Sequence, residues 1–193
     1  MKRWTLAAGL LALSANTLAA PPSAAMLANA CAGCHGTLGA SAGPSMPNLA
    51  GQSQPYLVAA MQAFRSGARP ATVMGRLAKA YSDAEILALA EYFSRQKPPA
   101  PVQAGVAEAS SARGRELHDK HCASCHVDSG RKINENTASP VPVVAGQWLG
   151  YLLIQLDDFA SGRRRMNEHM AEQTKPLSRE EWGAVAQFYA GVK

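Results

Sequence analysis

Two copies of one five-residue motif constrain this chain more than any other feature. Residues 31–35 read CAGCH and residues 122–126 read CASCH, and together they contain all four cysteines of the 193-residue chain. In a Cys-x-x-Cys-His motif the thiols are spaced to add to the vinyl groups of a haem, and the histidine turns onto its iron. A redox dithiol or half of a zinc site would need only Cys-x-x-Cys. The repeated motif therefore predicts two covalently bound haem c groups. The predicted attachment residues are Cys31, Cys34, Cys122 and Cys125, and the predicted iron ligands are His35 and His126.

The first twenty residues have the three-part form of a secretory signal peptide. Lys2 and Arg3 precede an apolar run over residues 6–13, and small residues follow at positions 19–20. We expect residues 1–20 to be removed on export, so that haem is attached in the periplasm. The apolar run is too short to span a membrane comfortably, with an uncleaved anchor as the alternative, and no later stretch is apolar enough. No membrane span is therefore expected after signal removal.

The charge of the chain gives no sign of a nucleic-acid partner. The formal net charge is +5, and loss of Lys2 and Arg3 with the signal would leave +3. Haem propionates would lower it further. The sequence has no basic stripe with interleaved aromatic residues, so nucleic-acid binding is not expected.

The two halves of the chain repeat more than the haem motif. Residues 50–52, Ala-Gly-Gln, recur as residues 145–147, at an offset of 95. The other matches at this offset are Tyr56 and Tyr151, Leu57 and Leu152, Phe64 and Phe159, Gly67 and Gly162, and Arg69 and Arg164. So many matches at one offset indicate a tandem duplication of one small haem domain.

The repeat predicts an all-α fold with about three helices around each haem. Ser82 with Glu85, and Ser178 with Glu181, fit capping boxes that start the last helix of each half. The apolar positions after each serine recur at three and four residues, as one buried helical face requires. The other predicted helices cover residues 23–31 and 53–66 in the first half and residues 108–122 and 147–161 in the second.

A proline-rich segment predicts the boundary between two domains. Residues 98–107 begin with Pro-Pro-Ala-Pro, which cannot continue a helix and favours an extended linker. The predicted domains are then residues 21–97 and 108–193. Domains of this size bury a marginal apolar core, so we expect each haem to supply much of the core.

The repeat also selects a second ligand for each iron. Met74 and Met170 each stand eight residues before the serine that starts the last helix. A thioether suits haem iron, and His/Met ligation suits electron transfer. We expect both methionines to lie in the loop before that helix. The rivals are Met46 and Met61 in the first half, which have no methionine at their repeat positions, and Met166 and His169 in the second.

Pro47 and Pro142 are candidates to orient the ligating histidines. Each stands three residues before an Ala-Gly-Gln sequence. A ligating histidine usually donates its other ring N–H to a carbonyl, and this hydrogen bond fixes the ring. The repeat position makes the two prolines candidates to supply that carbonyl, and the alternative is that they only stiffen a turn.

Two polar features accompany the second motif. His118 and His121 precede it, where a solvated or propionate-bonded histidine is expected. Residues 163–165 are three consecutive arginines, which could bind haem propionates or dock an acidic partner, although such runs are more often solvated turns.

Longer strings around these motifs carry a resemblance to a known family. They are residues 29–37 and 74–82 in the first half, and residues 117–122, 125–127, 145–148 and 163–166 in the second. In these strings the chain resembles dihaem class I cytochromes of the cytochrome c4 type and, more closely, the dihaem cytochrome subunit of flavocytochrome c sulfide dehydrogenase. Residues 47–52 are closer to the cytochrome c4 pattern. The resemblance implies two tandem class I cytochrome c domains.

The narrower resemblance implies the electron outlet of a sulfide oxidase. A separate FAD-containing flavoprotein subunit, forming a heterodimer with this chain, would oxidise sulfide, and the haems would reduce a soluble periplasmic acceptor. The chain has no Gly-x-Gly-x-x-Gly after a strand and no spare cysteine, so the flavin chemistry must lie elsewhere. We therefore expect a subunit that transfers electrons and does not itself catalyse sulfide oxidation.

Two alternatives remain from the sequence. As a free cytochrome c4, the protein would carry electrons to a terminal oxidase without a tight flavoprotein partner. A catalytic haem protein would need an open iron, which a methionine candidate at each haem disfavours.

Overall fold

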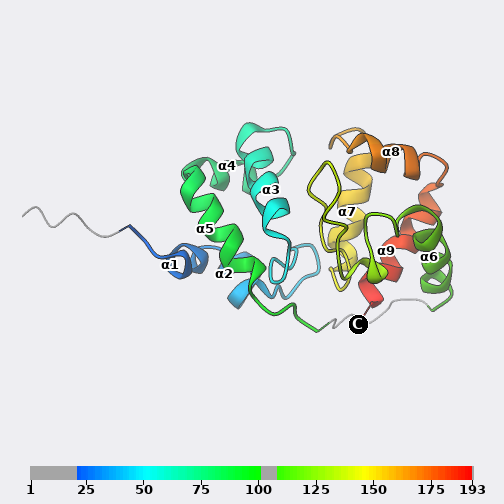
Figure 1. The fold of residues 1–193 in the computed structure, drawn as a ribbon, viewed down its shortest axis with the longest axis horizontal. Coiled ribbons are helices and arrows are strands. Elements are labelled where there is room, and N and C mark those ends of the chain that lie inside the picture. The colour runs from blue at the N-terminus through cyan, green and yellow to red at the C-terminus, as the bar shows by residue number, and fades with distance from the viewer. Residues whose placement is uncertain (1–20, 101–107, 193) are drawn as a thin grey trace, which may run out of the picture.

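The computed structural model describes residues 21–100 and 108–192, which form helices and no strands. The described chain folds into two helical halves that lie side by side, with α3 and α7 facing the middle (Figure 1). The predicted all-α class is confirmed. The predicted signal peptide, and residues 101–107 of the predicted linker, lie outside the described residues. Within the described part of the chain, no helix has both the length and the hydropathy needed to cross a bilayer.

The first half is built from three principal helices: α1 (Ala24–Asn29), α3 (Gln54–Ser66) and α5 (Asp83–Ser94). Both α1 and α3 pack against α5. The buried apolar cluster between them is small and consists of Ala28, Leu57, Leu89, Ala90 and Phe93. So small a cluster leaves much of the domain interior to be filled by something other than side chains.

The second half repeats this plan with α6 (Glu108–His121), α7 (Leu149–Ala160) and α9 (Arg179–Gly191). Here α6 and α7 both pack against α9. The backbones of α6 and α9 approach closely at Gly114, where a Cβ atom would overlap the carbonyl oxygen of Ala184 and the Cβ of Phe188. Only glycine permits this approach without moving one of the two helices.

Both predicted capping boxes are confirmed. The Oγ atom of Ser82 accepts a hydrogen bond from the Glu85 amide at 3.3 Å, and the Glu85 carboxylate accepts one from the Ser82 amide at 2.8 Å. Ser178 and Glu181 form the same reciprocal pair at 3.2 and 3.0 Å. Each box fixes where the last helix of its half begins.

Each half contains short helices in addition to its three principal helices. They are α2 (Ala32–His35), α4 (Met74–Leu77) and α8 (Glu168–Thr174), with 3-10 turns η1 (Thr37–Gly39), η2 (Ala78–Ala80) and η3 (Asp128–Gly130). The expectation that Met74 and Met170 lie in loops is therefore wrong, because Met74 begins α4 and Met170 lies within α8. The side chain of Asn167 caps α8 by accepting from the amides of His169 and Met170 at 3.0 and 3.4 Å. A helix this short shows no apolar periodicity in sequence.

The close helix crossing at Gly114 generates a prediction about stability. We expect Gly114→Ala to destabilise the second half by about 1–3 kcal/mol, because the methyl group forces α6 away from α9. Guanidinium unfolding of the haem-loaded protein, followed by circular dichroism, measures the change.

Gly183→Ala is the matched control, because Gly183 lies inside α9 and an added Cβ would meet nothing within 4 Å. The control should gain about 0.5–1 kcal/mol from the helix preference of alanine. If the two variants are equally stable, the crossing is not constrained as described.

Candidate haem sites

A cavity of about 1460 Å³ lies between the two halves and is lined by both motifs. The lining includes every cysteine and histidine of the two motifs: Cys31, Cys34, His35, Cys122, Cys125 and His126. Apolar side chains of both halves, Leu57 and Leu152 among them, complete much of the wall. Both predicted attachment sites therefore open onto one largely apolar space, as a flat and mostly apolar cofactor requires.

The two motifs share one hydrogen-bonded turn. The amide of His35 donates to the carbonyl of Cys31 at 2.9 Å, and the amide of His126 donates to that of Cys122 at the same distance. In the first half this turn forms α2, whereas the second motif is a series of turns. Burial raises the pKa of the Cys31 and Cys122 thiols. The turn presents both thiols and the imidazole of each motif to the cavity.

Both histidines are oriented by the predicted proline carbonyls. Nδ1 of His35 lies 2.9 Å from the Pro47 oxygen, and Nδ1 of His126 lies 3.2 Å from the Pro142 oxygen. The prediction for Pro47 and Pro142 is confirmed. Since the carbonyl can only accept, Nδ1 carries the proton and Nε2 keeps the lone pair that an iron ligand needs.

The ionisation state of these histidines fits the same role. Burial lowers the pKa of His35 and lowers that of His126 to about 4, although the hydrogen bond to the proline carbonyl opposes the shift in each case. Both imidazoles are neutral at physiological pH, which is the form that binds a metal.

The candidate sixth ligands differ in their relation to the cavity. Met74 and Met170 both line it and are half-buried. Met166 does not line the cavity, and its sulfur accepts a hydrogen bond from Thr174 Oγ1 at 3.3 Å. The other candidates that line the cavity are Met46, Met61 and His169. In the second half this leaves Met170 and the exposed His169 facing the cavity.

His118 is not solvated and does not line the cavity, so that expectation is wrong. It is 2% exposed, and its Nδ1 lies 2.9 Å from the Tyr189 hydroxyl. Its ring also packs against the rings of Phe188 and Tyr189, with centroids 5.3 and 5.5 Å away. His118 lies one turn after Gly114 and shares the face of α6 that packs on α9. His121, in contrast, does line the cavity.

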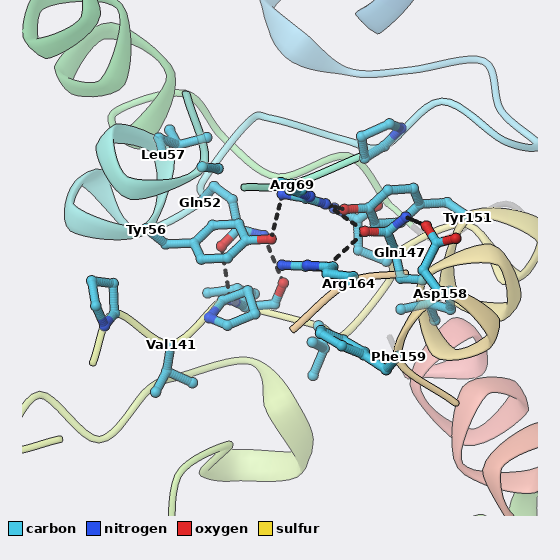
Figure 2. A pocket seen from close by; sticks show the side chains of 18 of the residues that line it. Gln52, Tyr56, Leu57, Arg69, Val141, Gln147, Tyr151, Asp158, Phe159 and Arg164 are labelled. Carbon is cyan, nitrogen blue, oxygen red and sulfur yellow. Dashed lines mark hydrogen bonds between the residues drawn. The ribbon is translucent and has the colours of Figure 1, made fainter. Parts of the chain in front are cut away.

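Two arginines from equivalent repeat positions meet at the boundary of the two halves (Figure 2). Arg69 is only 6% exposed and donates to the Tyr151 hydroxyl at 2.8 Å and to Gln155 Oε1 at 2.6 Å. A longer hydrogen bond of 3.3 Å joins it to the Tyr56 hydroxyl in its own half. Arg164 donates to the same Gln155 oxygen at 2.7 Å and also bonds to Tyr56.

These two guanidinium groups form a cationic pair without an anion. Among the described residues neither forms an ion pair, whereas the neighbouring Arg163 pairs with Asp157 and Asp158 at 2.7 and 2.9 Å. Burial and the charge of Arg69 lower the pKa of Arg164. The arginine run is thus not a simple solvated turn, because Arg164 faces the cavity wall. A buried and a half-buried cation beside a largely apolar cavity fit the carboxylates of a haem, and this agreement supports the predicted cofactor.

The positive charges of Arg69 and Arg164 also act on the pKa values of the adjacent tyrosines. Burial alone would raise the pKa of Tyr56, but the nearby charges of Arg69 and Arg164 outweigh it and lower the pKa. Burial and the neighbouring Tyr56 raise the pKa of Tyr151 to about 12. Tyr151 therefore stays protonated and keeps its hydroxyl at physiological pH.

Several residues of this boundary were visible in the sequence only as repeat markers. Tyr56, Arg69, Gln52 and Gln147 all recur at the 95-residue offset, but their residue types alone predict no role. Their recurrence together was the available signal, because members of the repeated set bond across the boundary to members of its other copy, as Arg69 does to Tyr151, the repeat mate of Tyr56.

Comparisons with known proteins agree with this geometry. The cytochrome c family model matches residues 22–97 and again residues 111–192. Cytochrome c4 of Azotobacter vinelandii is 33% identical over 182 residues, which cover 84% of each chain. The thiosulfate dehydrogenase electron acceptor of Thiomonas intermedia is 35% identical over 169 residues, covering 83% of this chain and 74% of that protein.

A third relative shares a shorter region, and a solved structure shares the fold. The cytochrome subunit of sulfide dehydrogenase from Chlorobaculum tepidum is 47% identical over 68 residues, which cover 35% of this chain and 61% of that subunit. The crystal structure of reduced cytochrome c4 from Pseudomonas stutzeri superposes with a TM-score of 0.76 at 26% identity, covering 86% of this chain and 95% of that one.

The burial of His118 predicts a pH dependence of stability. Burial lowers its pKa, so the folded state holds the neutral form, and the stability that this provides is present above the unfolded pKa. It is lost as the pH falls from about 7 towards about 5, because the unfolded chain binds a proton that the folded chain resists. The stability difference between wild type and His118→Gln should therefore shrink over this range in urea unfolding experiments. A constant difference would show that His118 does not resist protonation.

Proposed function

This chain belongs to the cytochrome c family as a dihaem electron-transfer protein of the cytochrome c4 type with two covalently bound haem c groups, and from this premise we propose its redox partner. We propose that it is the periplasmic cytochrome subunit of a sulfide dehydrogenase. It accepts electrons from a separate FAD-containing flavoprotein that oxidises sulfide and passes them to a soluble acceptor. The observation that carries the proposal is the 47% identity to the cytochrome subunit of a sulfide dehydrogenase, together with the motif-flanking strings noted in the sequence.

The residues around the cavity have separable tasks in this proposal. A bound haem supplies one-electron chemistry between ferric and ferrous iron. Cys31, Cys34, Cys122 and Cys125 hold the two haems covalently, and His35 with Met74, and His126 with Met170, ligate the irons. Arg69 and Arg164 hold propionate carboxylates. With a histidine and a methionine assigned to each iron, no ligand position would be left for a substrate, so the chain would transfer electrons without binding sulfide.

In the proposed organisation the chain has four segments. Residues 1–20 form a cleaved signal peptide, residues 21–97 and 108–193 form the two haem domains, and residues 98–107 link them. Export places the protein in the periplasm, where covalent haem attachment and the proposed partners are found together.

A second candidate is favoured by the extent of similarity. Cytochrome c4 and the thiosulfate dehydrogenase electron acceptor match more than four-fifths of this chain, whereas the sulfide dehydrogenase subunit matches about a third. In this second reading the protein is a free carrier, which receives electrons from a dehydrogenase other than a flavoprotein and delivers them to a terminal oxidase.

The methionine assignments predict a ligand-binding phenotype. Met74→Ala and Met170→Ala should each remove the sulfur–iron absorbance band of one oxidised haem and let that iron bind added imidazole or carbon monoxide. The absorption spectrum of the purified protein measures both effects. Met166→Ala is the matched control, because Met166 does not line the cavity, and its spectrum should match wild type. A normal spectrum for Met170→Ala would instead point to His169.

Purification from the native periplasm distinguishes the two proposed functions. We expect a flavin-bearing subunit to co-purify with the tagged dihaem protein in stoichiometric amount, and sulfide to reduce first the flavin and then the haems. Mass measurement and stopped-flow absorbance follow these events. A lone dihaem protein that sulfide does not reduce, but that a thiosulfate dehydrogenase does, would replace the first proposal with the second.

A further inference from the structure

Two buried glutamines join the halves through matching hydrogen bonds. Gln52 donates from Nε2 to the carbonyl of Val143 at 2.7 Å and accepts at Oε1 from the amide of Val143 at 2.8 Å. Gln147 does the same to Asn48 of the first half, at 2.7 and 3.1 Å. Asn48 and Val143 are themselves repeat mates at the 95-residue offset. Each half therefore forms two hydrogen bonds to the equivalent backbone position of the other half.

Asn48 and Val143, whose backbone groups bond to the glutamines, directly follow the two prolines that orient the haem ligands. The N–H of Asn48 and the C=O of Pro47 belong to one planar peptide unit, as do the N–H of Val143 and the C=O of Pro142. The Pro47 oxygen accepts from His35, and the Asn48 amide donates to Gln147. One rigid peptide thus connects the histidine of the first half to a glutamine of the second, and its counterpart makes the reverse connection.

The glutamines are held in place by their own halves. The amides of Gly51 and Gly146, which precede them, donate to the carbonyls of Phe93 and Tyr189 on the last helices, at 3.0 and 2.9 Å. Both glycines have φ near +70° (72° and 69°), a conformation that other residues rarely adopt. Gln52 and Gln147 are each 6% exposed, so water does not compete for their amide groups. Each glutamine is therefore held in place by its own half and by its hydrogen bonds to the opposite half.

We propose that each glutamine tunes the haem of the opposite half: Gln147 acts through the Pro47–Asn48 peptide on His35, and Gln52 through the Pro142–Val143 peptide on His126. A peptide whose N–H donates a hydrogen bond becomes a better acceptor at its carbonyl. The stronger carbonyl draws more strongly on the Nδ1 proton, which makes the imidazole a better electron donor to a metal at Nε2. A better donor favours the ferric state. Gln52 and Gln147 are thus positioning residues that lower the midpoint potential of the haem across the boundary.

This proposal rests on His35 and His126 as iron ligands, and the test separates the two claims. Gln147→Met and Gln52→Met keep a similar side-chain volume and remove both hydrogen bonds. In Gln147→Met we expect a higher midpoint potential for the first haem, and in Gln52→Met for the second. Spectroelectrochemistry combined with NMR gives each potential, with haem signals assigned by their contacts to Phe93 or Tyr189, which line the cavity in different halves.

A second readout reports the hydrogen bond itself. In the reduced protein with ¹⁵N-labelled histidine, the Nδ1 proton of His35 should move upfield in Gln147→Met, and that of His126 in Gln52→Met, because each bond to proline weakens. If no imidazole bound to iron is observed for His35 or His126 in the wild type, the ligand assignment fails, and this inference fails with it.

Trp148→Phe is the control for looser docking. Trp148 also bridges the halves, donating from Nε1 to the Ser41 carbonyl at 3.2 Å, but it contacts neither proline peptide through a hydrogen bond and does not line the cavity. In this variant the midpoint potentials of both haems and the Nδ1 proton signals of His35 and His126 should match wild type. Equal shifts of both haems in all three variants, or a shift confined to the haem of the substituted half, would overturn the crossed arrangement while leaving the ligands intact.

Discussion

Hydrogen bonds between buried amide groups of the two halves determine how the halves dock against each other. A buried peptide N–H or C=O without a partner costs about 1–3 kcal/mol, so the glutamine pairs permit only one register of docking. No buried side-chain nitrogen or oxygen among the described residues lacks a partner. With the register fixed, both motifs face one shared cavity, and the boundary arginines are brought together beside it. The position of one haem site relative to the other thus depends on two side chains outside both Cys-x-x-Cys-His motifs.

The same boundary concentrates positive charge that forms no ion pair with any acidic side chain in the described part of the chain. Arg69 and Arg164 each lie over a phenylalanine ring of their own half, 4.5 and 4.4 Å from the ring centroid, and share the oxygen of Gln155. Cation–π contacts and neutral hydrogen-bond acceptors solvate a guanidinium group but leave its charge uncompensated. Anionic groups bound in the cavity would complete this arrangement. The apolar clusters of both halves are small, so the group that supplies the missing charge also supplies the missing core.

Much of this arrangement was accessible from the sequence because it follows local rules or exact repetition. The haem motifs, the capping boxes and the proline carbonyls depend on residues close in sequence or on equivalence between the halves, and the structure agrees with each. The short helices α4 and α8 were missed, because a helix of one or two turns shows no periodicity, and α8 depends on the cap at Asn167. His118 was misplaced, since its burial is decided by the crossing of α6 and α9 at Gly114, a tertiary contact. The glutamine pairs join residues 91 to 99 positions apart, beyond any local pattern.

Repetition explains the common plan, and its exceptions explain how two similar sites can differ. The hydrogen bonds to backbone carbonyls at His35 and His126 are alike in both halves, so the two proposed iron ligands have similar surroundings. The differences between the halves lie in nearby residues that do not bond to these histidines. Phe93 of the first half is replaced at the equivalent position by Tyr189, whose hydroxyl bonds to the buried His118. Ser53, which bonds across the boundary to Val141, is replaced by Trp148, which bonds across it to Ser41. Because directional electron flow requires unequal potentials, these substitutions around a symmetric frame are where the protein can separate the two haems in energy without altering the ligands of either.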